Sequence, residues 1–318
     1  MTNTFTTPTP AKTIMTYFKD PRTRILLGDN LYHGRILAKT ITVPVNKENV
    51  KKYGIVSPKD YDKILDTVTL QIASSAQSMS KTDLILLNII SNYDWDRPIY
   101  FLQRGGDVNI GIKEYLQYEG FAYKLVPIKS STAISTNENI ENWQLDADKT
   151  YDFLMNESRL SSLAADYNVD YQNLLTFTSL VPIREIMVNV SKALILQGDT
   201  TKAINLLDKM QEVMPTNNYP LNVSYISSTN DLAVIEAIRT YLQCGQKEKA
   251  FAIANEFVDE TLKHLELQSN KWARIDVLRS NLLYLLYLSE NYQDLGYVAE
   301  AAEIKEIFDS YYAAYNNQ

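Results

Sequence analysis

Residues 80–129 read SKTDLILLNIISNYDWDRPIYFLQRGGDVNIGIKEYLQYEGFAYKLVPIK, and they predict a helix, a strand, a second helix and a second strand in that order. Ser80 and Asp83 have capping-box spacing, in which each side chain satisfies a backbone N–H of the first helical turn. The leucines and isoleucines of residues 84–90 leave almost no polar side. We therefore expect this first helix to be buried between layers.

The rest of this stretch carries strand and turn signals. Residues 99–102 are apolar and aromatic and predict a strand. Residues 110–119 have helical spacing, and Gly120 fits a C-cap glycine. A second strand is expected over residues 123–129, at a sheet edge because Pro127 removes a backbone donor.

Three segments in fixed order carry a family resemblance: Asn92-x-x-Trp95-Asp96-Arg97-Pro98-Ile99-Tyr100-Phe101, Tyr115-Leu116-x-x-Glu119-Gly120, and Tyr123-Lys124-Leu125-Val126-Pro127-Ile128. From about Thr40 onward the chain resembles the soluble C-terminal region of a large bacterial family of multi-pass membrane proteins. The membrane part of that family resembles GT-C-type glycosyltransferases related to protein O-mannosyltransferases.

The resemblance implies that this chain is the soluble part of a larger protein whose membrane-spanning part holds the active site. The membrane-spanning half that would hold the glycosyltransferase site is absent from this sequence, so no catalytic residue is assigned here. The implied partner is the chain's own upstream membrane-spanning region. The implied location is the extracytoplasmic, periplasmic face of the inner membrane, with Met1 as a fragment start.

Composition and periodicity divide the chain into four parts. Residues 1–16, rich in Thr and Pro, are expected to be a disordered tail or linker, and residues 131–150 a second linker. Residues 17–130 predict a small α/β domain, and residues 151–318 an all-α array. The expected fold class is α+β overall, with an α/β domain followed by tetratricopeptide-like helical hairpins.

The helical array is predicted from a repeated spacing of glycine, four residues and alanine. Glycine permits a tight turn and alanine a close approach of two helices. The repeat-structural residues are Gly198 with Ala203, Gly245 with Ala250, Gly296 with Ala301, and Pro215 as a helix breaker. The copies lie 47 and 51 residues apart, more than the roughly 34 of a standard tetratricopeptide repeat. The hairpins are therefore degenerate copies with longer loops, and a protein or peptide partner is expected in their groove.

Charge and rare residues limit the possible functions. Residues 151–318 hold 13 Lys and Arg against 22 Asp and Glu, which disfavours a nucleic-acid partner. Residues 1–150 hold 18 against 16, and basic residues near the start suit either a solvated surface or one beside a membrane. With two histidines, far apart, and one cysteine, Cys244, neither a metal site nor a cofactor is expected.

No segment reaches the 18 or so consecutive apolar residues that a membrane-spanning helix requires. Residues 1–11 also lack the basic and apolar regions of a secretory signal peptide. Taken as complete, the chain would therefore be cytoplasmic. Taken as part of the larger protein that the resemblance implies, it would be extracytoplasmic.

The candidate binding residues are Asn92, Trp95, Arg97 and Tyr100, at the junction of the first helix and strand. Aromatic faces and a planar guanidinium suit a sugar, a peptide or a neighbouring membrane loop. The structural interpretation is that Asn92 caps the helix, Trp95 packs in the core and Arg97 pairs with a nearby aspartate.

Two further hypotheses differ in class from a non-catalytic domain for acceptor recognition or protein–protein interaction. The first is a stand-alone adaptor built on the helical repeats. The second is a small hydrolase or transferase centred near Arg97, which requires a deep pocket with several perturbed ionisable groups.

Overall fold

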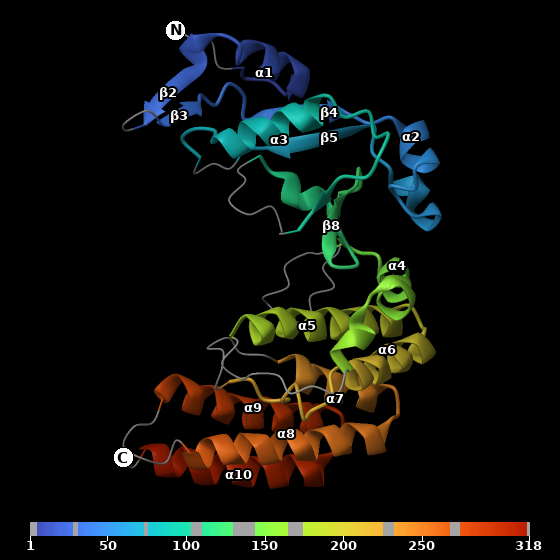
Figure 1. Cartoon of the computed structure of the whole chain (residues 1–318), viewed down its shortest axis with the longest axis vertical. Coiled ribbons are helices and arrows are strands. Elements are labelled where there is room, and N and C mark those ends of the chain that lie inside the picture. The colour runs from blue at the N-terminus through green and yellow to red at the C-terminus, as the bar shows by residue number, and fades with distance from the viewer. Residues whose placement is uncertain are drawn as a thin grey trace. The chain divides into compact units, whose positions relative to one another are not determined.

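The computed structural model describes residues 5–27, 31–72, 76–102, 110–129, 144–164, 174–224, 232–267 and 274–316. The chain divides into two compact units, Met1–Asp146 and Ala147–Gln318, called the N-terminal and C-terminal units below. The described part of the first contains small sheets and short helices, and that of the second is helical (Figure 1). This confirms the α+β class.

The first sheet of the N-terminal unit has β4 (Thr40–Pro44) at its centre. β4 pairs with β5 (Thr67–Gln71) antiparallel and with the short β1 (Thr9–Pro10) in parallel. Alternate side chains of β4 and β5 are buried and form part of the core, namely Ile41, Val43, Val68 and Leu70. The helix α2 (Lys47–Lys52) and the 3-10 helix η2 (Pro58–Lys63) lie between these two strands in the chain.

The expected disordered tail is wrong for residues 9–16. There β1 leads directly into α1 (Ala11–Tyr17), whose Ala11 and Ile14 side chains are buried. The short helix orders because it packs against β4 and against α3 (Lys81–Ser91). The expected linker is wrong for residues 144–150, which form β9 and α4, and residues 131–143 lie outside the described ranges.

A hairpin of β2 (Arg24–Leu27) and β3 (Leu31–Gly34) follows the 3-10 helix η1 (Pro21–Thr23). Gly34 exchanges two backbone hydrogen bonds of 2.8 Å with Met79. A Cβ on Gly34 would lie 2.9 Å from the Phe18 ring and 3.2 Å from Leu84. The end of the hairpin at Gly34 therefore lies next to Phe18, the first residue after α1, and next to Leu84 in the first turn of α3.

The helix α3 begins with the predicted capping box. The Ser80 hydroxyl accepts from the Asp83 N–H at 3.1 Å, and the Asp83 carboxylate accepts from the Ser80 N–H at 2.8 Å. Its burial, however, differs from the expectation. Leu86, Leu87 and Ile90 are buried, whereas Ile85 is 62% and Ile89 46% exposed, so one apolar side of α3 faces outward.

The second sheet has the order β6-β8-β7-β9, formed by β6 (Tyr100–Phe101), β7 (Leu116–Glu119), β8 (Ala122–Leu125) and β9 (Gln144–Leu145). The helix predicted over residues 110–119 is wrong, since it is the 3-10 helix η3 (Ile112–Tyr115) followed by β7. Gly120, with φ 65°, turns a hairpin between β7 and β8 instead of capping a helix. The expected edge position of the second strand is wrong, since β8 pairs with both β6 and β7. Pro127 lies beyond the end of β8 and so removes no donor from this strand.

The free edge of β5 is covered by the segment around η3. The Tyr115 hydroxyl accepts from the Thr69 N–H at 3.1 Å and donates to the Thr69 carbonyl at 3.0 Å. Gly111, with φ 68°, lies against Gln71, and a Cβ there would be 2.6 Å from the Gln71 nitrogen and closer still to its carbonyl oxygen. Only glycine fits this backbone approach.

The C-terminal unit is built from helices. It begins with α4 (Ala147–Asp152), the π-helix η4 (Phe153–Glu157) and the 3-10 helix η5 (Leu160–Ala164). Longer helices follow and stack in rows (Figure 1): α5 (Leu174–Leu196), α6 (Thr200–Val213), α7 (Ala233–Gln243), α8 (Lys247–Leu267), α9 (Ile275–Asp294) and α10 (Val298–Asn316). Successive helices pack as the pairs α5–α6, α7–α8 and α9–α10.

Each of these three pairs is joined by the same turn. The residue after the glycine donates its N–H to a carbonyl five residues back, as Asp199 does to Leu194, Gln246 to Tyr241 and Tyr297 to Tyr292, each at 2.9 Å. This is the Schellman pattern, and it requires the left-handed backbone that the glycines have, with φ values of 74–85°. Ala203, Ala250 and Ala301 are buried where the second helix begins, and Pro215 directly follows the C-cap of α6.

Candidate functional site

The four predicted binding residues at the α3–β6 junction do not converge on one site. Asn92 is the C-cap of α3, its N–H donating to the Ile89 carbonyl at 3.2 Å and its side-chain amide to the Asn88 carbonyl at 2.9 Å. Arg97 is exposed, and its guanidinium lies 4.0 Å from the Asp96 carboxylate. Asn92 therefore caps the end of α3, and Arg97 lies on the surface beside Asp96.

Trp95 is a core residue. Its side chain is 1% exposed, its indole nitrogen donates to the Pro44 carbonyl at 2.9 Å, and its ring centroid is 4.7 Å from that of Tyr93. Its φ of 57° is rare for a bulky residue, because the side chain crowds the backbone there. The neighbouring Asp94 carbonyl is held by the Asn49 amide at 2.9 Å, which helps to fix this conformation.

Tyr100 belongs to a polar group on the second sheet. Its hydroxyl donates to the Glu119 carboxylate at 2.6 Å, and the same carboxylate pairs with Lys124, which is 1% exposed. Burial, and after it the hydrogen bond to Glu119, raises the pKa of Tyr100 above its ordinary value. Glu119 therefore compensates the charge of the buried Lys124 and also accepts the hydrogen bond from Tyr100.

The N-terminal unit does contain a surface groove, and only Asn92 of the four lies beside it. The groove has a volume of about 660 Å³ and runs between α1 and α3. Its apolar part is formed by Met15, Phe18, Leu84 and Ile85, and its polar part by Lys12, Thr16, Lys19, Asn88, Ser91 and Asn92. The continuous apolar pattern of residues 84–90 is the sequence signal for this groove, because the side of α3 that no layer covers is apolar too.

The C-terminal unit contains a second candidate, a buried polar cluster that the sequence did not predict. Asn222 donates to the Thr261 hydroxyl at 2.8 Å and to the Asn281 amide oxygen at 2.7 Å. Its own oxygen accepts from the Ser224 N–H at 3.0 Å and from the Ser224 hydroxyl at 2.7 Å. The cluster thus joins residues 222–224 to α8 and α9.

Ser224 and His264 in this cluster are spaced like a nucleophile and its base. The Ser224 oxygen lies 3.4 Å from the His264 Nδ1 atom. The Ser224 hydroxyl already donates its one proton to Asn222, and its oxygen accepts from the Asn281 amide at 3.0 Å, so the proton that a base would remove is bonded to another residue. Burial lowers the pKa of His264 and raises that of the nearby Glu260, which accepts from the Asn222 N–H at 2.7 Å. The geometry favours a structural role.

We expect Asn222→Ala to lower the free energy of unfolding of the C-terminal unit by about 2–3 kcal/mol, because it leaves buried partners without hydrogen bonds. Urea unfolding followed by circular dichroism measures this, and peptide-level hydrogen exchange assigns it to α8 and α9. Asn205→Ala, at an exposed position of α6, is the matched control and should change stability by less than about 0.5 kcal/mol. Equal effects of the two substitutions would contradict the structural importance of the cluster.

Among the residues that the structure describes, the other functional residue types give no further site. Cys244 follows α7 as its C-cap, and burial raises the pKa of its thiol, which opposes reactivity. In the described ranges no group of His, Cys, Asp and Glu side chains is arranged to hold a metal ion. None of the helices in those ranges combines the length and the apolar character needed to cross a bilayer.

The geometry thus defines a two-unit α+β chain with a groove on its α/β unit and stacked hairpins in its helical unit. Residues 7–149, a little under half of the chain, match the family model of TMEM260-associated domain 2. The match includes residues 80–129, fits a TMEM260-like family and indicates a domain of a larger membrane protein. No curated protein and no solved structure matches the chain.

Proposed function

We propose that the chain is a non-catalytic, extracytoplasmic domain of a multi-pass membrane glycosyltransferase related to protein O-mannosyltransferases. Its role is to recognise or position an acceptor protein, or to hold an assembly together. The observation that carries the proposal is the match of residues 7–149 to a domain associated with TMEM260. The ordered motif from Asn92 to Phe101, within the same region, supports it.

A non-catalytic role is supported by the contacts of the most promising residues. Trp95 and Asn92 have structural partners, and Arg97 projects from the surface beside Asp96. The serine of the Ser224–His264 pair donates its hydroxyl proton to Asn222 and not to the histidine. A small enzyme centred near Arg97 would require a deep pocket around that side chain, whereas the Arg97 side chain is 73% exposed.

Partner binding is assigned to the C-terminal unit. The three hairpins, with their repeated glycine turns and buried alanines, are tetratricopeptide-like, and stacked hairpins of this kind offer a groove for an extended peptide or a helix. Positions 151–318 contain 22 acidic and 13 basic residues, and this negative balance favours a basic or neutral partner. The upstream membrane-spanning region is the other partner of the chain.

The proposal is tested with an antibody against this chain on fractionated native cells. We expect a band much larger than 36.3 kDa in the membrane fraction. Protease added to spheroplasts should remove it, because the domain lies on the extracytoplasmic side. A protected membrane band would contradict the location alone.

A soluble band near 36.3 kDa would overturn the membrane-protein proposal and favour a stand-alone adaptor built on the same hairpins. The acceptor role has a separate test, in which exposed acidic residues of the helical unit are changed to lysine. Unchanged partner capture by that variant would remove the role of the helical groove.

A further inference from the structure

The groove between α1 and α3 has an exposed apolar side with cations beside it. Ile85 and Ile89 are one helical turn apart on α3 and are 62% and 46% exposed. Lys12 and Lys19 line the same groove from α1 and the residues after it. These four residues define what is called the α1–α3 face below.

The elements around this face carry an excess of exposed positive charge. The described residues of positions 5–39 and 76–92 contain seven exposed Lys and Arg, namely Lys12, Lys19, Arg22, Arg24, Arg35, Lys39 and Lys81. They contain two carboxylates, and neither offers a free negative charge. Asp20 pairs with Arg22 at 2.5 Å, which lowers the pKa of that carboxyl, so this pair is neutral and six of the seven cations remain. Asp83 is fully buried in the capping box.

We infer that the α1–α3 face docks on the surface of an anionic lipid bilayer. Exposed isoleucines can enter the boundary between headgroups and acyl chains, while long lysine side chains extend to the lipid phosphates. The inference rests on the proposed function, because a domain tethered to a membrane protein meets such a surface at high local concentration. The two exposed isoleucines of α3, with Lys12 and Lys19 beside them, suit this flat, negatively charged partner.

The docking is tested by sedimentation of the 318-residue chain with vesicles. We expect it to bind vesicles of equal parts phosphatidylglycerol and phosphatidylcholine, and not vesicles of phosphatidylcholine alone. Binding should weaken as salt is raised, since salt screens exposed charges. A wild-type chain that stays in the supernatant with both vesicles would overturn the inference.

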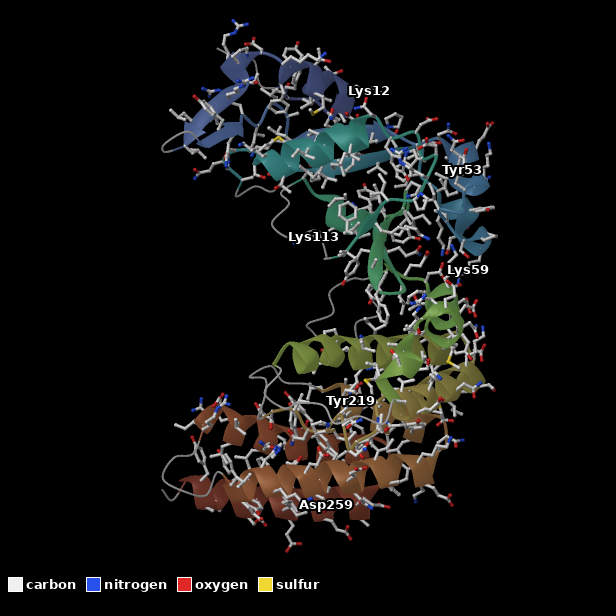
Figure 2. The ribbon with its side chains drawn as sticks, in the orientation of Figure 1. Lys12, Tyr53, Lys59, Lys113, Tyr219 and Asp259 are labelled. Atoms are coloured by element: carbon white, nitrogen blue, oxygen red, sulfur yellow. The ribbon has the colours of Figure 1, made fainter. Side chains whose placement is uncertain are left out.

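Two double variants separate the charged and apolar contributions. Lys12→Glu with Lys19→Glu, and separately Ile85→Ser with Ile89→Ser, should each reduce anionic-vesicle binding by about tenfold or more. The matched control is Lys59→Glu with Lys113→Glu, an equal charge change at exposed lysines on η2 and η3 (Figure 2). It should stay within about twofold of the wild type, with circular dichroism showing that all variants are folded.

Other outcomes point elsewhere. If the control weakens binding as much as the Lys12 and Lys19 changes, binding follows net charge and the face has no role. If a synthetic glutamate-rich amphipathic peptide binds at Lys12 and Lys19 while vesicles do not, the occupant is a protein and the lipid inference is wrong. A native membrane band without vesicle binding would leave the proposed function standing and remove this inference alone.

Discussion

Replacing Gly111 by alanine should lower the free energy of unfolding of the N-terminal unit by about 3–5 kcal/mol. Two effects add at this position. A φ of 68° is strained for any residue with a Cβ, and the new methyl group would overlap the backbone of Gln71 on β5. Relief would require η3 to move away from the strand that it covers.

Gly54→Ala is the matched control for this prediction. Gly54 has a similar φ of 60°, but nothing lies within 4 Å of the position its Cβ would take. Only the conformational penalty of about 1–2 kcal/mol should remain there. Urea unfolding of the two variants gives the difference, and equal losses would show that η3 does not lie close to Gln71.

Trp95→Ala should destabilise the N-terminal unit by about 3–5 kcal/mol, since it removes a large, fully buried side chain and leaves a cavity. Trp95→Phe keeps most of that volume but leaves the Pro44 carbonyl without its indole donor. The phenylalanine variant should therefore lose about 1–3 kcal/mol. Thermal unfolding monitored by circular dichroism ranks the variants.

The backbone at Trp95 allows a sharper comparison. Glycine normally destabilises more than alanine, but at φ 57° alanine is strained and glycine is not. Trp95→Gly should therefore be more stable than Trp95→Ala by about 1 kcal/mol. The opposite order would mean that the left-handed backbone relaxes once the indole is gone.

Local sequence signals predicted the local structure well. The capping box at Ser80, the strand at Tyr100 and Phe101, and the helical hairpins all follow from short-range spacing. The helix predicted over residues 110–119 failed because a glycine such as Gly120, with positive φ, serves a helix end and a two-residue hairpin equally well. Pairing with β8 decides between them, and spacing alone does not contain that contact.

Features that depend on distant residues had no comparable signal. Asn222, Thr261 and Asn281 meet only because α8 and α9 bring them together. The exposure of Ile85 and Ile89 could not be predicted either, because the sequence of an apolar helix does not indicate which of its sides is left uncovered. The candidate groove depends on the packing of α1 beside α3, and the sequence does not contain that contact.

Tyr115 and Gly111 together have a consequence for how copies of this domain behave in a crowded cell. β5 is an edge strand of its described sheet, and open edges invite strands of other molecules to add by backbone pairing. The phenol of Tyr115 occupies both backbone groups of Thr69, and the chain at Gly111 lies against Gln71. These contacts hinder edge-to-edge association of the sheets of two molecules, which matters most where many copies are held close together.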